Sequence, residues 1–237
     1  ALAEKNNLMK GVALAYKAIG MSYYYHEQRV DALVQWKLAL ETFRAANDQS
    51  GVSNMLNNLG AIHYNGGDDE AALGYYLESL KLAEAAKDTL RTLTALENIG
   101  TIYLTKPKSK DLALKYYRRA LPMSVATGDH DAIGTCAVNL GEIFLPKQGD
   151  TTEVKANDLD SAQYYFEMAL DAYRHSPTGN VPVALKNIGK VHALRKEYDK
   201  AIQYQTEAYQ VALATEAKLE MAQALLSLAD TYQDKGD

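Results

Sequence analysis

Asn58-Leu59-Gly60-Ala61-Ile62-His63-Tyr64 decides the fold, because close variants of this stretch return three times further along the chain. The variants are Asn98-Ile99-Gly100-Thr101-Ile102-Tyr103, Asn139-Leu140-Gly141-Glu142-Ile143-Phe144 and Asn187-Ile188-Gly189-Lys190-Val191-His192. An anchor glycine lies at positions 20, 60, 100, 141 and 189, which gives steps of 40, 40, 41 and 48 residues, and a further 40 residues lead to Ala229. A fixed period of this kind is typical of a solenoid built from repeats.

Composition narrows the class of protein and of partner. The 237 residues carry a formal net charge of −5, with 47% hydrophobic and 23% charged residues, as in an ordinary folded chain. The acidic balance, without a basic run, argues against a nucleic-acid partner. No apolar stretch reaches the roughly 18 to 20 residues that a membrane helix needs, so we expect a soluble segment without membrane insertion. One cysteine excludes an internal disulfide and leaves the compartment open between cytoplasm, which is favoured, and periplasm.

Each repeat reads as a pair of amphipathic helices. In the second repeat the apolar residues of the first helix fall at helical spacing and end at a glycine-containing turn over residues 65–68. They are Val52, Met55, Leu56, Leu59, Ile62 and His63. A second stripe then runs to the polar break at Lys87-Asp88, and it consists of Ala72, Tyr76, Ser79, Leu80 and Ala83. Neither helix could bury its apolar face alone, so we expect antiparallel hairpins that stack and share one core.

The residues at fixed positions of the hairpin resemble those of the tetratricopeptide repeat. Each set begins with a small anchor residue, and a residue with a ring follows three positions later. The second helix then carries a small residue, a residue that is usually aromatic, and another small residue. The sets are Gly20, Tyr23, Ala32, Trp36, Ala39; Gly60, His63, Ala72, Tyr76, Ser79; Gly100, Tyr103, Ala113, Tyr117, Ala120; Gly141, Phe144, Ala162, Phe166, Ala169; and Gly189, His192, Ala201, Gln205, Ala208. The common form of this repeat has 34 residues, whereas the longer period here is similar to that of spindle scaffolds, kinesin light chains and bacterial signalling proteins.

The resemblance implies an all-α fold, a right-handed superhelical solenoid of antiparallel helical hairpins with about five and a half repeats. We predict a single solenoid over residues 1–237. Its repeats are expected at 7–48, 49–88, 89–129, 130–177 and 178–217, followed by a half repeat at 218–237.

Both ends and two insertions depart from the regular pattern. Leu2-Ala3-Glu4 precedes Gly20 by the same spacing as Leu82-Ala83-Glu84 precedes Gly100. The latter triplet belongs to the end of a second helix, so we expect the chain to open on the last turn of a preceding second helix. Further sequence is expected on both sides of the fragment. Extra residues at 106–110 and at 146–160 are interpreted as loops between helices, the second being either a tolerated surface insertion or a partner contact. Pro122 should kink the second helix of the third repeat.

Asparagine recurs two residues before the anchor glycine, at Asn58, Asn98, Asn139 and Asn187. We call these four the register asparagines. In a superhelix of hairpins the first helices line the concave face, and this position lies beside the buried stripe. A side-chain amide offers a donor and an acceptor, so a row of amides can bond the main chain of an extended peptide. Such asparagine ladders are known in the family, and by resemblance these residues inherit a peptide-binding role. The alternative is that each asparagine bonds a neighbouring helix.

Other residues of the first helices extend the expected peptide-binding surface. On the asparagine stripe or beside it lie Asn54, Asn57, Thr94, Glu97, Thr101, Thr135, Glu142, Lys186 and Lys190. Their charges have both signs, so no single charge dominates. Ala18 and Ser227 replace asparagine at the two ends, which centres the expected site on repeats two to five. The Lys and Asn arrangement with which chaperone-binding relatives grip a terminal carboxylate is absent in its usual form.

The sequence contains little that would support catalysis or the binding of a cofactor. The five histidines show no metal-ligand spacing, and His63 and His192 occupy the ring position of the repeat. Cys136 aligns with small or apolar core residues and is expected to be buried and inert. We therefore expect no enzyme activity, no cofactor and no metal.

Two classes of function remain. The first is a protein-interaction module that binds an extended peptide or partner segment through the asparagine ladder. The alternative is the sensory input domain of a bacterial signalling protein, which binds a small ligand or peptide and controls an attached kinase, cyclase or transcription regulator outside this chain. The two differ in what is attached, so the sequence beyond Asp237 would separate them.

Overall fold

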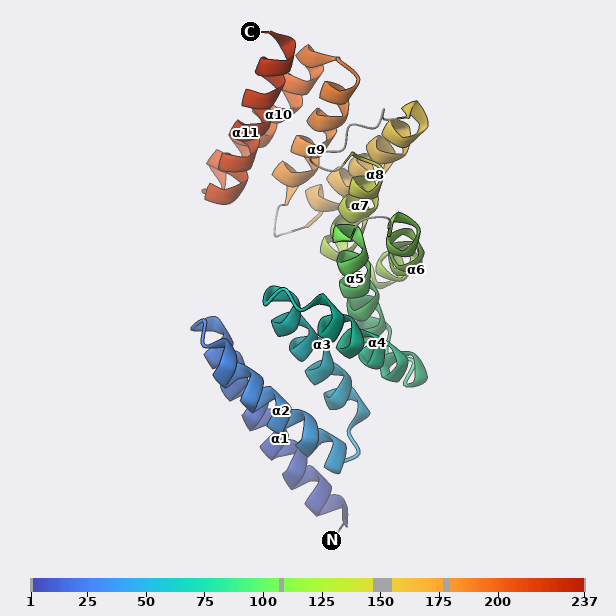
Figure 1. Ribbon diagram of the computed structural model, residues 1–237, viewed down its shortest axis with the longest axis vertical. Helices are drawn as coiled ribbons and strands as arrows, with labels where there is room; N and C mark the ends of the chain where they lie inside the picture. The colour runs from blue at the N-terminus through green and yellow to red at the C-terminus, as the bar shows by residue number, and fades with distance from the viewer. Residues whose placement is uncertain (1, 107–108, 147–154, 177–179, 237) are drawn as a thin grey trace. The chain divides into compact units, whose positions relative to one another are not determined.

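The chain forms eleven helices in the computed structural model, which describes residues 2–106, 109–146, 155–176 and 180–236, and no strand occurs in these ranges (Figure 1). The helices are α1 (Leu2–Tyr25), α2 (Arg29–Ala45), α3 (Gln49–Asn65), α4 (Asp69–Ala85), α5 (Thr89–Thr105), α6 (Lys110–Thr127), α7 (His130–Ile143), α8 (Ala156–Arg174), α9 (Val181–Leu194), α10 (Tyr198–Ala214) and α11 (Lys218–Lys235). The predicted all-α class with paired helices is thus confirmed.

Short turns with one left-handed residue set the helix length in the first half of the chain. Left-handed φ values of 61°, 54°, 80° and 53° occur at positions 27, 47, 67 and 87, which are 20 residues apart. In the last three of these turns an aspartate follows and caps the next helix: Asp48, Asp68 and Asp88 accept backbone N–H groups three residues ahead. Four successive helices, α2 to α5, therefore have 17 residues each.

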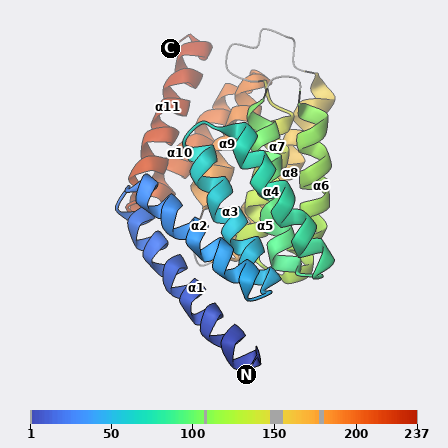
Figure 2. The ribbon, with the colours of Figure 1, turned by 60° about the horizontal axis from the view of Figure 1, so that its bottom comes forward.

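The helices fall into two compact units, residues 1–116 and 117–237, and each is described by itself. In the first unit α1 packs on α2 and α3 packs on α4, with α5 against α4 and α3. In the second unit α7 packs on α8, α9 on α10, and α11 against α10 and α9. Figure 2 shows the antiparallel pairing of α1 with α2. The direct contacts of α3 with α5 and of α9 with α11 bring successive first helices side by side.

Four of the anchor glycines, Gly20, Gly60, Gly141 and Gly189, lie against a large side chain of the following helix. A Cβ atom added at Gly60 would stand 2.5 Å from Cε1 of Tyr76, and one added at Gly141 would stand 2.5 Å from Cε1 of Phe166. Carbon atoms in contact are normally about 3.5–4.0 Å apart, so these positions require a residue without a side chain. The predicted role of glycine, to let two helices approach while a ring fills the space between them, is confirmed at Gly20, Gly60 and Gly141, whereas Gly189 faces the side chain of Gln205.

The ring position three residues after the glycine also works as expected. His63 lies 5.3 Å from Tyr75 between ring centroids, and His192 lies 5.3 Å from Tyr204 in a stacked arrangement. Nδ1 of His192 is also 2.8 Å from Oε2 of Glu197, at the start of α10. Both histidines are thus packing residues that tie the end of one helix to the next.

The structure corrects one prediction about the start of the chain. Helix α1 runs without a break from Leu2 to Tyr25, so residues 2–4 are not the end of a separate preceding helix. The breaks at the following repeats have a left-handed residue, which at Lys87 is followed by the capping residue Asp88. At the equivalent place the chain has Asn7-Leu8, and the helix continues through these residues.

The two insertions lie between helices, and the ends of those helices define the bounds of each insertion. The first separates α5 from α6, and residues 107–108 lie outside the described part of the chain. The second separates α7 from α8, and residues 147–154 lie outside it as well. Residues 156–160, which we assigned to this insertion, form the beginning of α8 instead. Pro122 lies inside α6, and the predicted kink stays a prediction.

Candidate functional site

The register asparagines lie on the first helix of four hairpins, two in each unit. In the first unit Asn58 of α3 and Asn98 of α5 are half-buried. In the second unit Asn139 of α7 is half-buried, whereas Asn187 of α9 is only 4% exposed. The same position in the repeat thus carries the same residue type in different degrees of burial.

Polar residues surround the asparagines of the first unit. Asn54 on α3 is half-buried and Asn57 is 8% exposed, while Glu97 on α5 is half-buried. Thr94 and Thr101 donate their hydroxyl groups to backbone carbonyls of their own helix, at 3.0 Å and 2.9 Å. Since α3 contacts α5, the expected residues of this unit are gathered on two adjacent helices.

Several side-chain amides have one buried atom that finds no hydrogen-bond partner in the described part of the chain. Nδ2 of Asn58 and Nδ2 of Asn187, two equivalent atoms, are buried without a hydrogen-bond partner among the described residues. On α3 the same is true of Oδ1 of Asn54 and Oδ1 of Asn57. A buried polar atom without a partner costs about 1–3 kcal/mol. These four atoms therefore have hydrogen-bonding capacity that the described residues do not use.

The second unit adds charge to this pattern. Glu142 of α7 and Lys190 of α9 are exposed, and Lys186 of α9 is half-buried and donates from Nζ to Oε1 of Gln223 at 2.8 Å. Burial lowers the pKa of Lys186, although Glu142 and Glu220 act in the opposite direction. Thr135 of α7 is also one of the expected surface residues of this unit, and its hydroxyl oxygen lies 3.4 Å from that of Tyr173.

The Glu142 carboxyl group is the counterpart of the two lysines. Burial among the surrounding helices raises its pKa, and the attraction of Lys186 and Lys190 only partly offsets this. The side chain still touches solvent, so water screens part of both effects. Opposite charges on α7 and α9 thus act on one another.

Gln223 and Glu220 of α11 belong to this region, and sequence reasoning missed both. Gln223 stands six residues before Ala229, the register that Asn54 holds relative to Gly60. This spacing could have identified Gln223 as an expected surface residue, because the last half repeat follows the same period as the other repeats. Its contact with Lys186 comes from the packing of α9 on α11.

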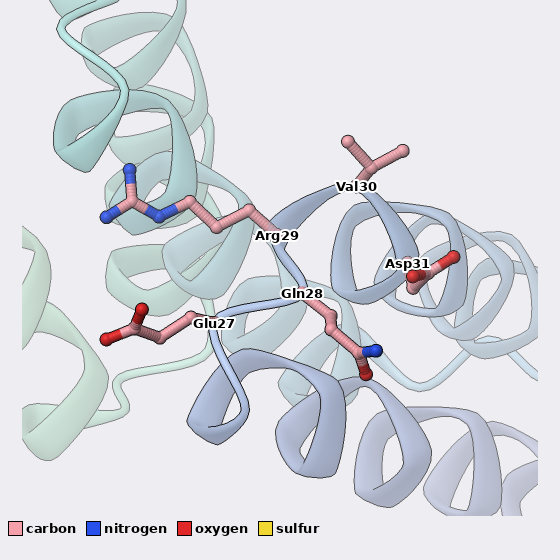
Figure 3. A pocket seen from close by; sticks show the side chains of 5 residues that line it. All are labelled: Glu27, Gln28, Arg29, Val30 and Asp31. Carbon is pink, nitrogen blue, oxygen red and sulfur yellow. The ribbon is translucent and has the colours of Figure 1, made fainter.

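The remaining features of the described residues offer less chemistry. A shallow hollow lies at the turn between α1 and α2, and Figure 3 shows its side chains diverging, with Val30 and Asp31 directed away from Glu27 and Arg29. Cys136 is fully buried, as predicted. Within the described ranges, no three His, Cys, Asp or Glu side chains are grouped so as to hold a metal ion. No described helix is long and apolar enough to cross a membrane.

Comparison with family models finds two matches, both described as tetratricopeptide repeat, at residues 51–124 and 151–217. Among curated proteins, the photosystem I assembly protein Ycf3 of Rippkaea orientalis is 36% identical over 91 residues. That match covers 38% of this chain and 47% of the relative, so it spans about half of that protein's length.

Solved structures with the same arrangement of helices have low sequence identity to this chain. The apo form of RapI has a TM-score of 0.76 at 16% identity, covering 90% of this chain and 74% of that one. A Rap protein in complex with competence and sporulation factor has a TM-score of 0.70 at 15% identity, covering 92% and 62%. PilF of Pseudomonas aeruginosa has a TM-score of 0.60 at 20% identity, covering 95% and 94%. These likenesses concern the fold.

Proposed function

We propose that this chain, which belongs to the tetratricopeptide-repeat family, is a protein-interaction module that holds an extended segment of a partner against its first helices. The register asparagines, Asn58 and Asn98 in the first unit and Asn139 and Asn187 in the second, would bond the main chain of the segment that their own unit holds. The flanking contacts would come from Asn54, Asn57, Thr94, Glu97, Thr101, Thr135, Glu142, Lys186 and Lys190.

The observation that carries the proposal is the unsatisfied state of the amides. Nδ2 is buried without a partner at both Asn58 and Asn187, although the two belong to different hairpins. Asparagine is a mediocre helix former, and an unpaired buried amide adds a further cost. A peptide main chain carries an N–H and a C=O group at nearly every residue, so small rotations of the side-chain amides would let them pair with it.

The test begins with a ligand that the protein itself selects. A library of random 12-residue peptides, joined to a carrier at both ends, is selected against the full chain, and the best peptide is labelled for fluorescence anisotropy. We expect Asn58→Ala and Asn187→Ala each to weaken its binding about 3- to 10-fold, the share of one hydrogen bond. Asn157→Ala is the matched control, because Asn157 is exposed near the start of α8.

A second measurement separates main-chain from side-chain recognition. Methylation of single backbone nitrogens of the peptide removes N–H donors and leaves the side chains in place. The proposal expects several methylated peptides to bind at least about tenfold more weakly. It is wrong if no peptide is selected, or if both asparagine variants bind like wild type while keeping their helical content and melting temperature.

The sensory input domain stays an alternative prediction. It would use the same first helices and differ in the domain attached to the chain. A kinase, cyclase or transcription-regulator domain encoded in the same gene would support it, and the selected peptide would then change the activity of that domain.

A further inference from the structure

The charges of α7, α9 and α11 set the second unit apart from the asparagine-rich first unit. On α3 and α5 the expected contact residues are neutral apart from Glu97. In the second unit the equivalent surface carries Glu142 on one helix and Lys186 and Lys190 on the next. The two lysines are four residues apart, so they lie on one side of α9.

Among the described residues, these three side chains form no hydrogen bond or ion pair with one another. Neither Glu142 nor Lys190 has a hydrogen bond or an ion pair within the part of the chain that the structure describes. Lys186 has the neutral side chain of Gln223 as its hydrogen-bond partner. By contrast, several exposed charges of the second helices form ion pairs, such as Lys200 with Glu197 at 3.0 Å and Arg44 with Glu78 at 2.9 Å.

The three side chains differ in solvation, since Lys186 is half-buried whereas Glu142 and Lys190 are exposed. Burial lowers the pKa of Lys186, so for this half-buried group the loss of water outweighs the attraction of Glu142 and Glu220. A ligand group of the complementary sign would replace the missing water and gain more here than on an open surface. The positive side is on α9 and the negative side is on α7, which gives the surface a direction.

An extended peptide can match this direction with two side chains. In a strand, residues i and i+2 point to the same side and lie about 6.6–6.8 Å apart. Lys186 and Lys190 both act on the carboxyl group of Glu142 through their charges, and acidic and basic side chains of a peptide are long and can adapt to the separation of the two helices.

We propose that the second unit selects a peptide segment with one acidic and one basic side chain two residues apart, the acidic group against Lys186 and Lys190 and the basic group against Glu142. This inference rests on the proposed function, because it names the kind of segment that the same first helices hold. It concerns side-chain carboxylates within a chain, not the free end of a chain.

The experiment compares selections from one peptide library against matched variants. The probe is the random 12-residue library joined at both ends, so that no terminal carboxylate is present. Wild type is expected to enrich acidic and basic residues at positions i and i+2. Lys190→Gln is expected to lose the acidic preference and Glu142→Gln the basic one. Lys200→Gln, which removes a lysine already paired with Glu197, is the control and should select like wild type.

Affinities of one selected peptide give the size of the effect. We expect about tenfold weaker binding to Lys190→Gln and to Glu142→Gln than to wild type. In the exchange variant Glu142→Lys with Lys190→Glu, the net charge is unchanged and the peptide with its two charges exchanged should bind better than the original peptide. Circular dichroism confirms that each variant keeps its helices.

The outcomes separate the two proposals. Peptides selected without a charge preference, or with a preference that all variants share, overturn this inference and leave the interaction module standing. Failure to select any peptide overturns both. Enrichment only in a parallel library with free carboxyl ends also overturns it, because the lysines would then recognise a chain terminus.

Discussion

Replacement of Gly60 by alanine tests the contact on which every hairpin depends. The new Cβ atom would lie 2.5 Å from Cε1 and 2.7 Å from Cδ1 of Tyr76, whose side chain is buried. Since carbon atoms in contact are about 3.5–4.0 Å apart, the ring or one of the helices must move by about 1 Å. Tyr76 is held in the core between α3 and α4, so the move disturbs packing on both helices.

The expected size follows from two opposing effects. Extra volume in a packed core typically costs about 1–3 kcal/mol. Alanine is a better helix former than glycine by about 1 kcal/mol, which offsets part of this cost. We expect Gly60→Ala to lower the free energy of unfolding by about 1–2 kcal/mol. For a chain of this length that corresponds to a fall of roughly 2–8 °C in melting temperature.

The matched control is Gly74→Ala on α4. No atom lies within 4 Å of a Cβ built at Gly74, so the helix-forming gain acts alone and should raise the unfolding free energy by about 0.5–1 kcal/mol. Thermal and urea unfolding followed by circular dichroism measure both variants. The same chemical change is thus expected to have opposite signs at the two sites.

A double variant checks the cause. Tyr76→Leu removes the ring that the new methyl group would meet, so Gly60→Ala should cost less in that background, with a coupling energy of about 1 kcal/mol. The reasoning is refuted if Gly60→Ala stabilises the chain as Gly74→Ala does, or if its cost is the same with and without the ring.

Three further predictions concern single side chains. Gln205 is 1% exposed and its Oε1 has no partner among the described residues, so Gln205→Met should raise the unfolding free energy by about 1 kcal/mol; a lower urea midpoint would contradict this. The pKa of Asp88 is lowered, first by the backbone N–H of Arg91 and also by its side chain, so its stabilising effect is present above about pH 4 and is lost as the pH falls through the folded-state pKa. Asp88→Asn keeps the helix cap and should make the melting temperature less dependent on pH below about pH 4, whereas an unchanged profile would disagree. Cys136 is fully buried and should react with a thiol reagent on the order of a hundredfold more slowly in the folded chain than in urea; equal rates would show that the thiol is accessible.

Local patterns predicted most of the fold. The period of Gly20, Gly60 and Gly100 identified the repeat, and the apolar stripes gave the faces that the helices bury. This succeeds because a helix repeats every 3.6 residues, so the order of residues alone decides which side is apolar. The start of the chain was misjudged because the spacing of the repeat does not show whether a helix is interrupted, and α1 continues through Asn7-Leu8.

The sequence predicted which positions belong to the candidate site. The burial and the hydrogen-bond partners of these residues depend on neighbouring helices. Sequence placed Asn58 and Asn187 in one register, yet packing leaves the first half-buried and the second 4% exposed. Sequence also marked Lys186, but only the approach of α11 to α9 gives it Gln223 as a partner. Helical periodicity fixes the direction in which a side chain leaves its own helix, whereas its solvation, its partner and its pKa depend on atoms from other hairpins, and these are brought near only by the tertiary structure.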